Sequence, residues 1–179
     1  MDSEKTLSSK VIYEGKILKL RVDTVLTADG HKSTREIIEH GDCIAVVAID
    51  DSDDVLLVRQ YRRAAEKDLL EIPAGGIDPG EDPETAVIRE MQEETGFRPQ
   101  KVERLGGYYL SPGFSSEYLH LYLAANLKHS PLHAEDTPGI GLEPVSVGGI
   151  RDLISSGKIE DAKSIAGLLM YLEYRKKTK

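Results

Sequence analysis

The chain has 179 residues, which fits one globular domain with a small appendage and is long enough to bury a hydrophobic core. It is 40% hydrophobic and 30% charged, and its net charge of −8 argues against non-specific binding to nucleic acids or membranes, since both favour a basic surface. The single cysteine excludes an intramolecular disulfide, and a polar N-terminus with no long apolar stretch after it predicts a cytoplasmic protein without signal peptide or membrane span.

The first part of the chain predicts a small antiparallel β unit. Residues 1–9 are expected to be loose. Residues 10–25 alternate in part between apolar and charged side chains, which predicts a strand. An Asp-Gly pair at 29–30 predicts a turn, and residues 33–39 predict the return strand. Because such a unit is not stable alone, we expect it to pack on the main domain, on a second subunit or on both.

A second group of strands follows. Residues 43–49 are almost all apolar and predict a strand buried on both faces. Residues 55–61 predict the strand that pairs with it, and residues 69–72 predict a short third strand. The second strand ends in an arginine cluster, Arg59 to Arg63, which has two interpretations. The arginines could clamp phosphate or carboxylate groups of a ligand, or they could pair with nearby acids such as Glu71.

A loop and one helix come next. Residues 78–81, Asp-Pro-Gly-Glu, are typical of a turn. Asp82 is a good N-cap, and Pro83 suits the first helical position because its missing N–H would be unpaired there. Gly96 suits the position that follows a helix. The helix is therefore expected from Pro83 to Thr95.

Glutamates gather on one side of this helix. At about 100° per residue, Glu90, Glu93 and Glu94 fall within one arc of roughly 100°. Arg89 can pair with Glu93, four residues later, but nothing nearby in the sequence relieves the other two. A divalent cation would relieve them, because hard ions such as Mg²⁺ prefer oxygen ligands. The alternative is a solvated acidic face, the commonest meaning of a glutamate-rich helix.

The small residues before the loop offer a further oxygen ligand. Residues 73–76 are Pro, Ala, Gly and Gly, and they let the backbone approach a ligand closely. The carbonyl of Ala74 could then bind the cation, because ions of this type accept backbone oxygens.

The remaining elements are predicted as strands at 102–110, 118–124 and 143–147 and as a helix at 150–156. Residues 129–142 have no periodicity and predict a loop of the kind that often serves as a lid. Asp161 is expected to cap the last helix, which carries one apolar stripe.

The loop and helix together resemble the Nudix box. Its pattern is Gly75, five residues, Glu81, seven residues, Arg-Glu, an apolar residue, one residue, Glu-Glu, one residue, Gly96 and an apolar residue, and every fixed position is filled. A match at so many specified positions is a far more specific signal than a lone glycine-rich loop. The resemblance covers residues 41–179 and implies an α/β fold, a Nudix-type α/β/α sandwich around a mixed β-sheet. Residues 1–40 would form a separate N-terminal β unit for dimerisation or for covering the substrate.

The resemblance implies a metal site. Glu90 and Glu94 would be the main ligands of Mg²⁺, with Mn²⁺ as the alternative ion, and Glu93 and the carbonyl of Ala74 would assist. Arg89 would orient the glutamates. The residues with a structural role in the motif would be Gly75, Glu81 and Gly96.

The resemblance also implies a general base. In similar enzymes an acid from the loop before the late strand takes this role. The candidates here are Glu135, which we favour, Asp136 and Glu143. Residues 138–141 stand where relatives are often more acidic, so Glu93 is the fallback.

Phrases outside the box resemble one subfamily, the ADP-ribose pyrophosphatases. They lie at 58–62, 71–75, 111–113 and 161–165, and Pro112 follows Gly96 by sixteen residues, as the marker proline of this subfamily does. The resemblance implies metal-dependent hydrolysis of ADP-ribose to AMP and ribose 5-phosphate by a homodimer. The implied substrate-binding residues are Arg62, Tyr61, Arg59, Glu36, Pro112 and Gly113.

Two other functions stay open. One is a pyrophosphatase for another nucleotide sugar, such as GDP-mannose, because few contacts decide the base and the sugar. The other is a sensor that binds ADP-ribose without cleaving it. The complete set of box acids and the lack of a helix-turn-helix segment argue against the sensor.

Overall fold

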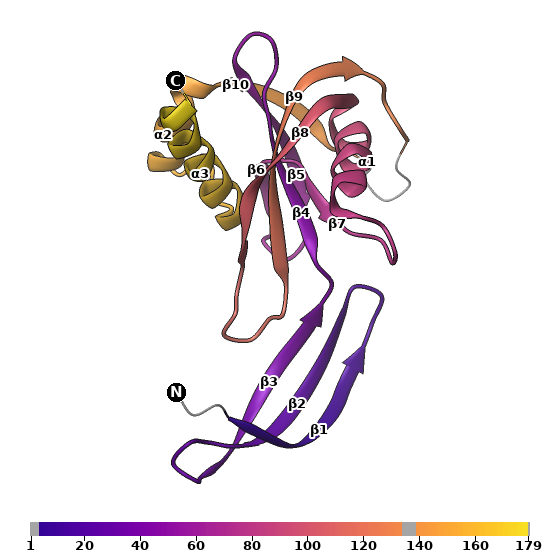
Figure 1. Ribbon diagram of the computed structural model, residues 1–179, viewed down its shortest axis with the longest axis vertical. Coiled ribbons are helices and arrows are strands. Elements are labelled where there is room, and N and C mark those ends of the chain that lie inside the picture. The colour runs from indigo at the N-terminus through magenta and orange to yellow at the C-terminus, as the bar shows by residue number, and fades with distance from the viewer. Residues whose placement is uncertain (1–3, 134–138, 179) are drawn as a thin grey trace. The chain divides into compact units, whose positions relative to one another are not determined.

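The computed structural model describes residues 4–133 and 139–178 (Figure 1). The elements in chain order are β1 (Lys5–Glu14), β2 (Leu18–Leu26), β3 (Lys32–His40), β4 (Cys43–Ala48), β5 (Asp54–Arg62), β6 (Lys67–Glu71), β7 (Ala74–Gly76), α1 (Pro83–Thr95), β8 (Phe97–Tyr109), β9 (Tyr118–His129), β10 (Gly141–Ser146), the 3₁₀ turn η1 (Val147–Gly149), α2 (Ile150–Ser155) and α3 (Ala162–Thr178). None of the helices in these ranges combines the length and the apolar character that a membrane span needs.

The chain forms two compact units. The first ends at Asp42 and also takes in Tyr109–Tyr118. The second consists of Cys43–Tyr108 and the part that begins at Leu119. A functional division of the chain at residue 40 stays a prediction.

The first unit contains an antiparallel sheet in the order β1-β2-β3, which confirms the predicted N-terminal β unit. Two details of the prediction are wrong. Residues 1–9 are not all loose, because β1 begins at Lys5, and the single strand expected over 10–25 is two strands. The chain turns between them at Gly15, whose N–H donates to the carbonyl of Leu18 at 3.0 Å. Every residue of β1 is exposed, so the burial pattern that marks a strand in a sequence is missing there.

The second unit contains two sheets. In the sheet β7-β4-β9-β8, strand β4 runs antiparallel to β7 and parallel to β9, so this sheet is mixed, as predicted. In the sheet β10-β5-β6, both neighbours run antiparallel to β5. The predicted pairing of 43–49 with 55–61 is therefore wrong apart from one bridge between Ile49 and Val55. Strand β5 bonds to β10 and β6 on its two sides, which uses its backbone groups along most of its length.

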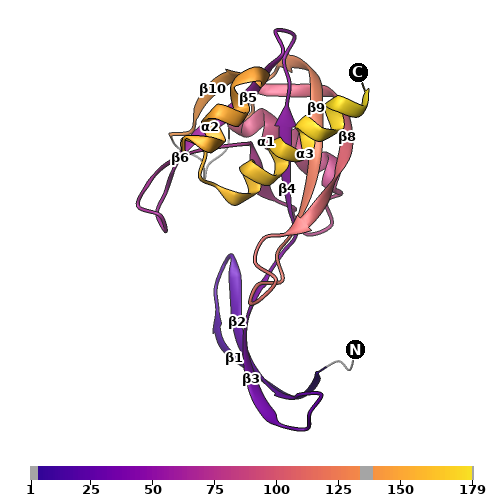
Figure 2. The same cartoon turned by 90° about the vertical axis from the view of Figure 1, so that its left-hand side faces the viewer.

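Helices cover both faces of β4. Every residue from Ile44 to Ala48 is fully buried, which confirms the prediction of a strand buried on both faces. Ala86, Val87 and Met91 of α1 share one core cluster with alternate residues of this strand. Helix α3 also contacts β4, and Figures 1 and 2 place α1 and α3 on opposite sides of it. This arrangement is the expected α/β/α sandwich.

Helix α1 begins and ends where the sequence predicts. The Asp82 side chain accepts the backbone N–H groups of Glu84 and Thr85, both at 3.1 Å. Gly96 has φ 77° and donates its N–H to the carbonyl of Gln92 at 3.2 Å, a left-handed conformation that glycine adopts without strain. These caps fix the ends of the helix and therefore the directions in which its glutamates point.

Helix α3 is tied to the chain between β6 and β7. Asp161 accepts the backbone N–H of Ser164 at 2.9 Å, which confirms the predicted cap. The Ser164 hydroxyl in turn accepts the N–H of Ile72 at 2.9 Å. A Cβ added at Gly167 would lie 2.9 Å from side-chain carbons of Ile72 and Leu121, so the helix packs very closely on these strands.

Candidate active site

Helix α1 carries two buried carboxylates. Glu90 is 8% exposed and Glu94 is 9% exposed, and acids are rarely so buried unless they are paired. Burial raises the pKa of Glu94 to about 8, and the charge of Glu90 adds to this effect. Burial also raises the pKa of Glu90, although the hydrogen bond from Arg89 offsets part of the rise. Neighbouring buried acids of this kind gain from a bound cation, which favours their charged form.

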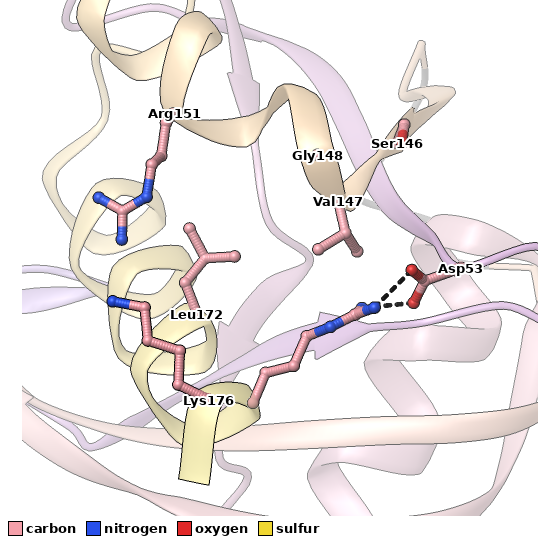
Figure 3. Close-up of a pocket in the computed structure, with 8 residues that line it drawn as sticks. Asp53, Ser146, Val147, Gly148, Arg151, Leu172 and Lys176 are labelled. Atoms are coloured by element: carbon pink, nitrogen blue, oxygen red, sulfur yellow. Dashed lines mark hydrogen bonds and ion pairs between the residues drawn. The ribbon is translucent and has the colours of Figure 1, made fainter. Parts of the chain in front are cut away.

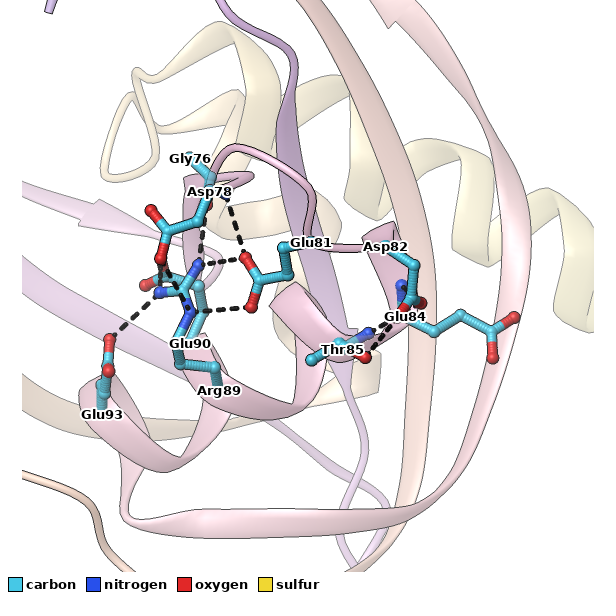
Figure 4. Close-up of polar contacts among 9 residues, drawn as sticks. All are labelled: Gly76, Asp78, Glu81, Asp82, Glu84, Thr85, Arg89, Glu90 and Glu93. Atoms are coloured by element: carbon cyan, nitrogen blue, oxygen red, sulfur yellow. Dashed lines mark hydrogen bonds and ion pairs between the residues drawn. The ribbon is translucent and has the colours of Figure 1, made fainter.

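Arg89 holds the surrounding acids in place, as Figure 4 shows. Its Nε and Nη2 donate to the two oxygens of Glu81 at 3.0 and 2.9 Å, and Nη2 also donates to the carbonyl of Gly76 at 2.9 Å. Its Nη1 donates to Glu90 at 2.6 Å and to Glu93 at 3.3 Å. The expectation that nothing local relieves Glu90 is therefore wrong. The guanidinium group has five N–H donors, so it can reach its sequence neighbour as well as the residue one turn later.

Gly75 leaves room for the carboxylate of Glu90. A Cβ at Gly75 would fall on the side-chain carboxylate of Glu90, whereas a Cβ at Gly76 would meet nothing within 4 Å. The first glycine is needed because another group occupies the space of its missing side chain. The backbone at Gly75 thus forms a cradle for the Glu90 carboxylate, and any residue with a side chain at position 75 would clash with that carboxylate.

Strand β7 lies against the part of α1 that carries Glu94. The N–H of Ala74 donates to a carboxylate oxygen of Glu94 at 3.0 Å. The predicted ligand set, which also includes Glu90 and Glu93, consists of hard oxygens only. This donor set and the cradle at Gly75 suit a divalent cation such as Mg²⁺ or Mn²⁺. The assignment of each residue as a ligand stays a prediction.

The arginines of β5 are paired with acids. Arg62 donates from Nε and Nη2 to the two oxygens of Glu71 at 2.8 and 2.7 Å. Arg59 donates from Nε to an oxygen of Glu143 at 2.9 Å, and its Nη2 forms an ion pair with the same oxygen at 2.8 Å. The pair of Arg62 with Glu71 is the kind that the sequence left open as the alternative, whereas the partner of Arg59 lies 84 residues away and was not expected. Both arginine side chains stay partly exposed and Tyr61 lies exposed between them, so a role in substrate binding remains a prediction.

Sequence analysis missed the second partner of Glu71. The ammonium group of Lys163 contacts Glu71 and donates to Asp161 at 2.9 Å. Burial pushes the pKa of Glu71 up, but the hydrogen bonds from Arg62 and Lys163 outweigh this effect and the pKa lies below its ordinary value. A lysine in the first turn of a helix usually lies in solvent, and no local pattern indicates a partner 92 residues away.

The remaining predicted residues lie in the first unit or outside the described residues. Glu36 in β3, Pro112 and Gly113 are all exposed, and all three belong to the first unit. Glu135 and Asp136 lie outside the described residues.

A cavity of about 550 Å³ contains none of the predicted site residues (Figure 3). It is lined by Asp53, Ser146, Val147, Gly148, Arg151, Leu172, Arg175 and Lys176. Arg175 pairs with Asp53 at 2.6 Å, and Arg151 and Lys176 pair with Glu173 at 3.5 and 2.6 Å. The basic side chains of this cavity are therefore already matched by acids.

The raised pKa of Glu94 predicts that the metal-free protein loses stability as pH rises. Its pKa is about 8 in the folded protein against an ordinary value of 4.5, so between these values the folded state holds a proton that the unfolded state has released. The free energy of unfolding should therefore fall from pH 4.5 towards pH 8, by up to about 1.4 kcal/mol per pKa unit. A bound cation removes this cost, so stabilisation by Mg²⁺ should be small at pH 5 and large at pH 8.

Thermal unfolding with EDTA and with Mg²⁺ at pH 5, 6.5 and 8 measures this effect. Glu94→Gln is the control, because it lacks the titrating group and should show much less pH dependence of the Mg²⁺ effect. An equal gain in Tm at pH 5 and pH 8 in the unsubstituted protein would contradict the prediction.

Comparisons with known protein families match residues 4–153 of the chain. A family model described as the NUDIX domain matches residues 39–153. A second model, described as the nucleoside diphosphate sugar hydrolase N-terminal domain, matches residues 4–38.

Individual proteins match over similar lengths. The chain is 33% identical over 174 residues to the ADP-ribose pyrophosphatase of Bacillus subtilis, which covers 96% of the chain and 94% of the relative. It is 35% identical over 178 residues to a methanol dehydrogenase activator of Bacillus methanolicus, with 98% and 96% covered. A crystal structure of an ADP compounds hydrolase matches with a TM-score of 0.92 and covers 99% of this chain and 97% of that one. At 20% identity, this last likeness concerns the fold alone.

Proposed function

This chain belongs to the Nudix family, and from that premise we propose that it hydrolyses the diphosphate bond of ADP-ribose to AMP and ribose 5-phosphate. The observation that carries the proposal is the complete Nudix box, with Glu90 and Glu94 buried together and Glu90 seated against Gly75. The choice of substrate is supported by the similarity to the Bacillus subtilis ADP-ribose pyrophosphatase and by the match of residues 4–38 to a nucleoside diphosphate sugar hydrolase domain.

The acids of α1 would hold the cation that this family requires. Glu90 and Glu94 are the proposed main ligands, and Glu93 and the carbonyl of Ala74 assist. A bound Mg²⁺ or Mn²⁺ supplies neutralisation of the diphosphate charge and activation of a water molecule. Arg89 keeps Glu90 and Glu93 in position by donating to both carboxylates.

The C-terminal end of β5 would bind the substrate. Glu71 holds Arg62 by two N–H groups of its guanidinium, and the exposed part of the group can donate to diphosphate oxygens. Tyr61 is 51% exposed, which leaves its ring available to stack on the adenine base. The proposed substrate set also keeps Arg59, Glu36, Pro112 and Gly113.

A general base must take the proton of the attacking water. We keep Glu135 as the first candidate, with Asp136 as its neighbour. Glu143 is the weaker candidate, because it accepts a hydrogen bond from Arg59 and forms an ion pair with it, and this pair would have to open first. Glu93 is the fallback, since it lies on α1 beside the proposed ligands and its side chain is 20% exposed.

Several finer features stay predictions. They are Mg²⁺ as the preferred ion, a homodimer built with residues 1–40, a cytoplasmic location and the absence of a nucleic-acid partner. The charge of −8 supports the last of these, because nucleic acids bind basic surfaces.

Hydrolysis of a nucleotide panel, with Mg²⁺ and with EDTA, tests the proposed function. The panel contains ADP-ribose, GDP-mannose, UDP-glucose, NADH, diadenosine polyphosphates and 8-oxo-dGTP, and chromatography separates the products. We expect AMP to appear fastest from ADP-ribose and only with metal. Faster turnover of GDP-mannose or a dinucleotide would contradict the assignment of ADP-ribose as the substrate and would leave the proposed metal site intact. Tight binding of ADP-ribose without any turnover would support the sensor instead.

A further inference from the structure

A cluster of buried charges lies where α3 begins. Glu71, the last residue of β6, is 1% exposed, and Lys163, in the first turn of α3, is 9% exposed. The Lys163 ammonium contacts Glu71 and donates to Asp161 at 2.9 Å. Arg62 approaches the same carboxylate with two N–H groups at 2.8 and 2.7 Å. One buried carboxylate therefore joins β5, β6 and α3.

The segment that follows Glu71 leads directly to the proposed metal ligands. The N–H of Ile72 donates to the hydroxyl of Ser164 at 2.9 Å, so α3 holds both Glu71 and the first residue of the segment. The N–H of Ala74 donates to Glu94 at 3.0 Å, so α1 meets the segment two residues later. The position of the Ala74 carbonyl is thus set between α3 and α1.

Stability alone is a poor explanation for this cluster. Moving charges out of water costs free energy, and well-packed apolar residues often leave a protein as stable as a buried ion pair does. A guanidinium group that donates two parallel hydrogen bonds to a carboxylate fixes direction as well as distance. The cluster therefore suits a positioning role better than a stabilising one.

We propose that Lys163 is a positioning residue, which through Glu71 fixes the guanidinium of Arg62 and the segment from Ile72 to Gly75 against the glutamates of α1. Its effect on the cation is independent of the substrate. Its effect on turnover rests on the proposed function, because it acts through the group of Arg62 that would bind the diphosphate.

Lys163→Met tests the proposal, since it keeps an unbranched side chain and removes the ammonium group with its charge. Lys67→Met is the matched control, because Lys67 lies on β6 and pairs with Glu160 at the surface. Calorimetric titration with Mn²⁺ should show affinity that is about 10- to 100-fold weaker in Lys163→Met and unchanged in Lys67→Met. The KM for the substrate should also rise in Lys163→Met alone. A lysine with a merely structural role would lower Tm and leave the Mn²⁺ affinity unchanged, and that result would overturn the proposal.

If Lys163→Met does not fold, a double variant tests the proposal instead. In Glu71→Gln/Lys163→Met both buried charges are removed, so no uncompensated carboxylate is left at position 71. Weak Mn²⁺ binding by the folded double variant supports the proposal, and affinity equal to the unsubstituted protein overturns it. Mn²⁺ binding is measured without nucleotide. A failure of the ADP-ribose assignment would therefore appear in the hydrolysis of the nucleotide panel and not in this titration.

Discussion

Glu90→Gln is expected to lower kcat for ADP-ribose by about 10²- to 10³-fold, while the protein stays folded and still binds the nucleotide. The substitution keeps the size of a buried side chain and removes the charge that would hold the cation. Steady-state kinetics with saturating Mg²⁺ measure kcat. Titration with a non-hydrolysable analogue of ADP-ribose measures nucleotide binding. The metal-free variant should be as stable as the unsubstituted protein or more stable, because an ionised carboxylate is costly to bury.

Glu84→Gln is the matched control for this variant. Glu84 lies in the first turn of the same helix and is exposed, so the same chemical change should leave kcat unaltered. Unchanged turnover in Glu90→Gln would remove Glu90 from the metal site. An equal loss in both variants would point to a general effect of charge on α1.

Gly75→Ala is expected to reduce activity by about the same factor and to lower the free energy of unfolding by about 1–3 kcal/mol. The added methyl group would coincide with the carboxylate of Glu90, so this side chain must leave its seat or the backbone must shift. Gly76→Ala is the control, because its methyl group would meet nothing within 4 Å and it should change stability by less than about 0.5 kcal/mol. Chemical denaturation and the ADP-ribose assay measure the two effects.

A second substitution separates the clash from other causes. In Gly75→Ala/Glu90→Ala the space of the carboxylate is free, so stability should recover relative to Gly75→Ala. Activity should not recover, because the proposed metal ligand is gone. Equal behaviour of Gly75→Ala and Gly76→Ala would contradict the account of the cradle.

The sequence by itself determined the parts of this protein that depend on neighbours along the chain. The bounds of α1 were predictable because Asp82, Pro83 and Gly96 act through bonds within a few residues. The buried strand β4 was predictable from its unbroken apolar run. The grouping of the glutamates follows from helical periodicity, which is equally local.

Only the tertiary structure decided how distant segments meet. Strand β5 joins β6 and β10, because strand pairing depends on the whole sheet and carries no local signal. Residues 5–9 of strand β1 escaped the prediction because the strand lies exposed in its unit and shows no burial pattern. Arg62 proved to be paired, and Lys163 proved to be buried against Glu71, through contacts that span 9 and 92 residues. The same holds for Gly75: the sequence indicates a small residue there, but the carboxylate of Glu90 that fills its space becomes visible only when helix and loop have packed together.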